Sequence, residues 1–235
     1  MEELRNRLIQ VSKVYGDQAF LRAGINVIPF VGGSIDILLS SSGQKFVIRR
    51  IENFINELDK QVRLLGEDKI NKEFLSTEQG FDIIIKAFGS ASRTRQTQKL
   101  NLYARIVRSS LSWGIEFEED EPEIYLRIVE ELSVKELRVA KYLFELKEIR
   151  RKNPEWIDPD VDRKDMKNDI LWLSKKYPEL NEDELVSSLV RLERTGLIRE
   201  LVGTYMDYQG GDYLINPMFK KFLDFLGGFE GKEFP

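Results

Sequence analysis

The side chains that could do chemistry in this chain are carboxylates, lysines, arginines, tyrosines and hydroxyls, because the sequence contains no histidine and no cysteine. Zinc sites built from Cys and His, Ser-His-Asp triads and Cys-His dyads are therefore excluded for this chain alone. The sequence also lacks a phosphate-binding glycine loop, a dinucleotide fingerprint and a nucleophile elbow. We therefore expect a non-enzymatic protein without a cofactor or a metal ion.

The most pronounced charge feature is a run from Ile83 to Ile115 that contains no acidic residue. Its cations are Lys86, Arg93, Arg95, Lys99, Arg105 and Arg108. Such a run can bind nucleic acid or anionic lipid. At about 100° per helical residue, however, these side chains point in several directions. The acidic run of residues 116–123 offers them partners, so internal ion pairing and an anion contact are both open interpretations.

Residues 158–169, DPDVDRKDMKND, have acids at the first, third and fifth positions, as calcium loops do. Such a loop needs glycine at the sixth position and a bidentate Glu at the twelfth. This chain has Arg163 and Asp169 there, and a helix-capping role accounts for Asp162 and Asp165. We therefore predict no metal site in this segment.

Residues 180–201, LNEDELVSSLVRLERTGLIREL, have the pattern of the third helix of a winged helix-turn-helix, which reads DNA in many such domains. Here, however, Glu182, Asp183 and Glu184 open the helix, where they suit its dipole but would repel phosphates. The cations that could contact a DNA backbone lie at the far end: Arg191, Arg194 and Arg199. We predict that this helix makes protein contacts, with DNA binding as the alternative.

Three capping-box patterns in the second half predict three helices, near residues 133–149, 162–177 and 181–195. The first residues of these patterns are Ser133, Asp162 and Asn181. Gly196 fits the end of the third helix. Two short apolar runs, LIRELV and DYLINP, then predict a hairpin, and MFKKFLDFL predicts a closing helix. Together these elements predict a winged-helix module over residues 123–228, followed by a tail at 229–235.

The first half predicts an all-helical domain over residues 1–115, joined to the module by an acidic linker at 116–122. Helices are expected at 2–23, from Lys45 to Leu65, and after a Ser76–Gln79 capping box. The last of these is expected to break near residues 89–92, because glycine and serine are poor helix interior. Residues 24–41 read as a buried turn, or alternatively as a membrane-inserting hairpin. The whole chain is therefore predicted to be mainly α.

The N-terminal sequence MEELRNRLIQ has no apolar signal-peptide core, so we expect a cytoplasmic protein. The net charge of −4 does not favour general binding of polyanions. A protein partner or a homo-oligomer is the expected partner, a nucleic acid is the alternative, and no membrane is expected.

One pattern resembles a known family. The segment LYARIVRSS, residues 102–110, precedes a segment with Tyr125, Ile128, Leu132, Ser133 and Glu136. This order is similar to that of bacterial abortive-infection proteins of the alpha type, although Glu121-Pro122 replaces their usual His-Pro. The resemblance implies phage defence as a context, and it carries over no catalytic residue. We expect an interaction or regulatory protein; the alternatives are a DNA-binding transcriptional regulator and a membrane-disrupting effector.

Overall fold

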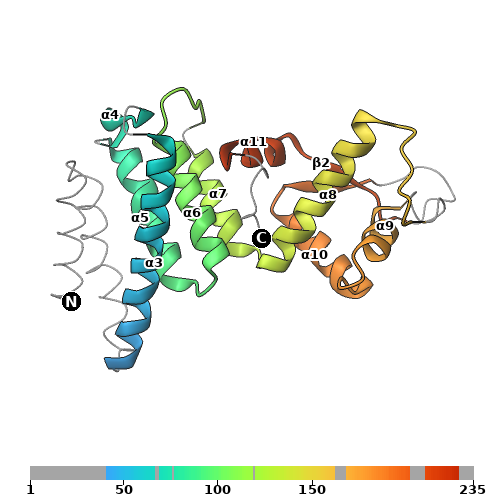
Figure 1. Ribbon diagram of the computed structural model, residues 1–235, viewed down its shortest axis with the longest axis horizontal. Helices are drawn as coiled ribbons and strands as arrows, with labels where there is room; N and C mark the ends of the chain where they lie inside the picture. Colours follow the sequence, from blue (N-terminus) through green and yellow to red (C-terminus); the bar gives the residue numbers. More distant parts are fainter. Residues whose placement is uncertain are drawn as a thin grey trace. The chain divides into compact units, whose positions relative to one another are not determined.

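The computed structural model of the chain describes residues 41–66, 69–75, 77–118, 120–161, 168–201 and 210–227. These residues are mainly helical, with one two-stranded sheet, as the sequence predicts (Figure 1). The helix predicted at 2–23 and the turn or hairpin predicted at 24–41 lie outside the described residues, apart from Ser41. Among the described helices, none combines the length and the apolar character needed to cross a membrane.

The chain forms two compact units. The first holds the described residues up to Glu130 together with Phe225–Gly227, and the second holds Glu131–Asp224. We predicted the boundary at 116–122, but the first unit continues through the helix α7, Glu121–Glu131. The reason is that α7 buries Tyr125 and Val129 within the first unit. The end of the acidic run, Glu121 and Glu123, thus forms the first turn of a helix of the first unit instead of belonging to a separate linker.

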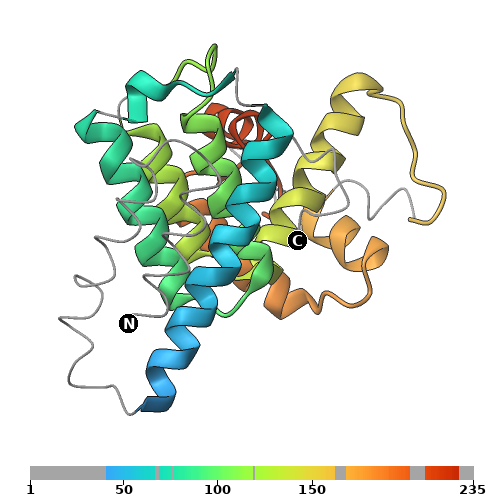
Figure 2. The ribbon, with the colours of Figure 1, turned by 60° about the vertical axis from the view of Figure 1, so that its left-hand side comes forward.

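The first unit is built on α3 (Ser41–Leu65), α5 (Glu78–Arg93) and α6 (Thr97–Ser110), which pack on one another (Figure 2). A short helix, α4 (Lys72–Leu75), precedes α5. The apolar stripe predicted for α3 is confirmed where it is described, since Ile51, Ile55 and Leu58 are buried. Gly66 follows α3 with φ of 89°, as a helix-ending glycine should.

The predicted break between two helices is confirmed, but it lies slightly later than expected. The helix α5 continues through residues 89–92 to Arg93, Thr94 is its C-cap, and α6 starts at Thr97. The capping residue of α5 is Thr77, whose side chain accepts a hydrogen bond from Gly80 N; the predicted cap, Ser76, lies outside the described residues. The small residues at 90–92 are buried, so they stay helical because other helices pack closely against them.

The second unit contains α8 (Val134–Lys152), α9 (Asp169–Lys176), α10 (Glu182–Arg194) and the antiparallel strands β1 (Ile198–Glu200) and β2 (Tyr213–Ile215). The helix α10 packs on α8, α9 and β1. The closing helix α11 spans Pro217–Phe225. The capping box of Ser133 and Glu136 is confirmed in both directions. Asn181 caps α10 as predicted, and Gly196 ends it with φ of 78°.

The start of α9 differs from the prediction. Asn168 is its N-cap, with its side chain accepting a hydrogen bond from Leu171 N. The predicted capping residues Asp162 and Asp165 lie outside the described residues, as does the loop of residues 202–209 between the strands. The hairpin register pairs Ile198 with Ile215 and Glu200 with Tyr213.

Candidate functional site

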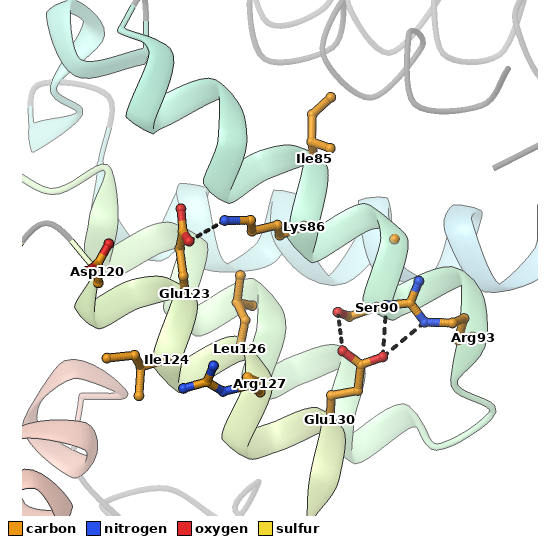
Figure 3. A pocket seen from close by; sticks show the side chains of 11 residues that line it. Ile85, Lys86, Ser90, Arg93, Asp120, Glu123, Ile124, Leu126, Arg127 and Glu130 are labelled. Atoms are coloured by element: carbon orange, nitrogen blue, oxygen red, sulfur yellow. Dashed lines mark hydrogen bonds and ion pairs between the residues drawn. The ribbon is translucent and has the colours of Figure 1, made fainter. Parts of the chain in front are cut away.

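A half-open groove of about 630 Å³ lies between α5 and α7 in the first unit (Figure 3). Two ion pairs cross from one helix to the other: Lys86 with Glu123, and Arg93 with Glu130 at 2.8 Å. The partners are seven residues apart on each helix, so the two helices run in the same direction. Ser90 Oγ donates a further hydrogen bond to Glu130 at 3.2 Å.

The groove carries balanced charge. Its cations are Lys86, Arg93 and Arg127, and its acids are Asp120, Glu123 and Glu130. Lys86 and Arg93 are each paired with an acid, and the acids equal the cations in number, so the groove has no excess of positive charge that would attract a polyanion. Within the part of the chain that the structure describes, no group of three acidic side chains is placed to hold a metal ion.

The basic residues predicted to contact anions mostly face the interior of the first unit. Lys99 is 8% exposed, and its ammonium donates to the backbone oxygen of Glu130 at 2.9 Å. Arg105 is also 8% exposed. Arg108 donates to Gln61 Oε1 at 3.1 Å, and burial lowers the pKa of its guanidinium. These three cations stabilise the fold. Arg93 and Arg95 are exposed: Arg93 pairs with Glu130, and Arg95 lies in the break between α5 and α6.

The Arg108 contact belongs to a buried polar network between α3 and α6. Glu57 accepts hydrogen bonds from Asn101 Nδ2 at 2.7 Å and from Gln61 Nε2 at 3.2 Å. Burial alone would raise the pKa of the Glu57 carboxyl, but the hydrogen bonds from Gln61, Asn101 and Lys60 lower it overall. The network therefore holds a charged carboxylate inside the helical unit at neutral pH.

In the second unit, one of the two predicted contact arginines of α10 is engaged within the unit and the other is not. Arg191 donates to Glu136 Oε1 on α8 at 2.6 Å, so it is engaged within the unit. Arg194 is exposed at the end of the helix and has no partner among the described residues. At the start of the helix, Glu184 pairs with Lys135, whereas Glu182 and Asp183 are exposed.

The exposed face of α10 is partly apolar, which we did not predict from the sequence. Leu185, Leu189 and Leu192 are fully buried, but Val186 is 39% exposed and Val190 is 57% exposed. A signal for this exists in LVSSLV, residues 185–190, where apolar residues come in adjacent pairs. Adjacent residues on a helix point about 100° apart, so one member of each pair must leave the core face.

A buried charge cluster fixes the base of the hairpin in the second unit. The Asp169 side chain is fully buried and contacts Lys147 Nζ at 2.5 Å and Arg150 Nη1 at 2.8 Å, both from α8. The same carboxylate accepts a hydrogen bond from Tyr213 N on β2 at 2.7 Å. The cluster joins α8, α9 and β2, so its role is to hold the second unit together.

Comparison of the chain with protein-family models, curated proteins and solved structures gave no match.

Proposed function

We propose that the chain is a non-enzymatic interaction or regulatory protein, and that its second unit is a winged helix-turn-helix module that contacts protein through α10. The order of elements supports this proposal, because three helices are followed by a two-stranded antiparallel hairpin. In this assignment α10 is the third helix, the one that reads DNA in DNA-binding members of the class. The question is therefore what its exposed face can bind.

The observation that carries the proposal is the composition of this face. Val186 and Val190 lie one helical turn apart and are both exposed. Exposed apolar side chains on a helix are suited to a protein surface and contribute nothing to phosphate contacts. The acids Glu182 and Asp183 occupy the end that would enter a DNA groove. Arg191, the cation that follows Val190 in the sequence, donates a hydrogen bond to Glu136.

The rival function, DNA binding, has one observation in its favour. Arg194 and Arg199 are exposed and have no partner in the described parts of the chain. They can be tested by titrating labelled random-sequence duplex DNA with the protein at several salt concentrations, using fluorescence anisotropy. We expect no salt-dependent binding at micromolar protein. Binding that weakens steeply with salt and is lost in Arg194→Glu/Arg199→Glu would overturn the proposal, because it would demonstrate phosphate contacts by this module.

The protein contact is tested with the immobilised chain and a lysate of the cells that encode it. We expect retained proteins, or a second copy of the chain, to be lost on Val190→Glu. The matched control is Leu64→Glu, because Leu64 on α3 is 76% exposed and receives the same chemical change. A retained set that is the same for wild type and Val190→Glu, together with no self-association, would contradict a role for α10.

The resemblance to abortive-infection proteins of the alpha type supports phage defence as the proposed context. The residues that carry it lie on α6, α7 and α8. Tyr103 and Ile106 are core residues, and Ser133 with Glu136 forms a helix cap. These positions have structural roles, so the resemblance suggests a similar helical arrangement and assigns no functional residue.

A further inference from the structure

We infer that the partner of the α10 face is a second copy of this chain, bound with its α10 antiparallel to the first. This inference rests on the proposed function and names its partner. Five exposed residues form one stripe along α10: Asp183, Val186, Ser187, Val190 and Arg194. At about 100° per residue they fall within an arc of about 100°. The stripe is therefore one continuous face, with an acid at one end, valines in the middle and an arginine at the other end.

The stripe is complementary to itself when it is turned around. A twofold axis midway between Ser188 and Leu189 places Asp183 of one copy level with Arg194 of its partner, because these residues are equally far from the midpoint. The same axis places Ser187 level with the partner's Val190, and each Val190 within about 1.5 Å along the axis of the partner's Val186. Contacts related in this way are what an isologous dimer requires.

The charges at the two ends have no other use in the described structure. The side chains of Asp183 and Arg194 make no ion pair with any described residue. They cannot pair with each other in one helix, since eleven residues separate them by about 16 Å. Antiparallel association would form two ion pairs, one between Asp183 and Arg194 at each end of the paired helices. Parallel association would place like charges opposite one another, which is unfavourable.

The size of the stripe sets the expected strength. A stable interface buries about 800 Å² on each partner, and one face of a thirteen-residue helix offers less than that. We therefore expect a dimer with a dissociation constant in the micromolar range, in reversible equilibrium with the monomer as the protein concentration changes.

The decisive experiment is a charge swap measured by sedimentation equilibrium. Asp183→Arg and Arg194→Asp should each weaken self-association by about tenfold or more, because each places two like-charge pairs in the dimer. Mixing these two variants should restore association at the wild-type level, since every charge pair is then complementary. The double variant Asp183→Arg/Arg194→Asp should also self-associate. Glu155→Arg is the control, because it makes the same change of charge at an exposed position after α8 and should leave association unchanged.

Cross-linking tests the orientation. The chain has no cysteine, so engineered thiols report without background. A mixture of Ser187→Cys and Val190→Cys chains should form the mixed disulfide faster than either variant forms its own. A faster like-with-like reaction would overturn the antiparallel arrangement.

Two outcomes separate this inference from the proposed function. A chain that is monomeric at all concentrations but retains a lysate protein through Val190 would overturn the homodimer alone. Salt-sensitive DNA binding lost on Arg194→Glu/Arg199→Glu, in a chain that is monomeric, would overturn both.

Discussion

The Arg191 guanidinium on α10 donates a hydrogen bond to Glu136 on α8, and the same Glu136 carboxylate accepts from Ser133 N at 2.6 Å in the capping box of α8. One carboxylate thus caps one helix and fixes a second helix against it. The relationship explains why Arg191 is not free for a ligand. It also connects the start of α8 to the last turn of α10.

We predict that Arg191→Met lowers the free energy of unfolding of the second unit by about 1 kcal/mol, because it leaves a nearly buried Glu136 without its cationic partner. Arg194→Met is the matched control and should change it by less than about 0.5 kcal/mol. The measurement is urea unfolding followed by the fluorescence of Trp156 and Trp172 in a Trp113→Phe background. Equal losses for the two variants would mean that the Glu136 contact contributes nothing to stability.

The Asp169 cluster should be the most sensitive polar site of the second unit. Asp169→Asn leaves Lys147 and Arg150 without their shared carboxylate and weakens the bond to Tyr213 N. We expect a loss of about 3–5 kcal/mol, as for other broken buried ion pairs. Asp160→Asn is the control: Asp160 is 68% exposed beside Lys176, so its loss should cost less than about 1 kcal/mol. The same fluorescence-detected urea unfolding measures both variants, and similar losses would contradict a structural role for Asp169.

The sequence predicts the helices of this protein well where a local rule determines them. Ser133 and Asn181 cap their helices, and Gly66 and Gly196 end theirs, because each rule concerns neighbouring backbone groups only. Where contacts between distant segments decide, prediction fails. The domain boundary was placed before α7, yet the contacts of α7 with α5 and Phe225 place it in the first unit.

The candidate site shows the same limit. The acid-free basic run and the acidic run after it are visible in the sequence, but their pairing is not. Arg93 with Glu130 and Lys99 with the Glu130 backbone join residues more than thirty positions apart. No periodicity in the sequence specifies which acid meets which cation. The adjacent apolar pairs of residues 185–190 signal that part of α10 leaves the core, but which members are exposed depends on which side of α10 packs against α8 and α9.

The stability of the first unit should depend on pH through Glu57. Its pKa in the folded protein is held below the ordinary value of 4.5 by hydrogen bonds from Gln61, Asn101 and Lys60 that outweigh the effect of burial. A lowered carboxyl pKa contributes stability that is fully present above the unfolded-state pKa and is lost as pH falls through the folded-state pKa. The wild type should therefore exceed Glu57→Gln in stability at neutral pH, and the difference should shrink in acid below about pH 4.5.

Urea unfolding followed by far-ultraviolet circular dichroism, at several pH values, measures this difference. Asp59→Asn serves as the control, because Asp59 pairs with Arg63 on the exposed side of α3. A wild-type advantage over Glu57→Gln that stays constant into acid would show that the carboxylate form of Glu57 does not carry the effect.

Two glycines should respond to alanine in opposite directions. Gly196 ends α10 with φ of 78°, and its N–H donates to Glu193 O at 2.9 Å. An added Cβ would meet only the mobile end of Met218, at 3.1 Å, so the backbone conformation is the main obstacle. Gly196→Ala should therefore cost about 1–2 kcal/mol, the penalty of a left-handed conformation for an L-residue.

Gly89 is the matched comparison, because it lies inside α5 with an ordinary helical conformation. A Cβ there would meet Arg93 Nη1 at 3.6 Å, which is a normal contact. Gly89→Ala should raise the free energy of unfolding by about 0.5–1 kcal/mol, since alanine favours the helix and restricts the unfolded chain. Thermal unfolding of both variants by calorimetry measures the two signs. Destabilisation by Gly89→Ala would mean that the groove between α5 and α7 tolerates no added methyl group and is more tightly packed than its half-open shape indicates.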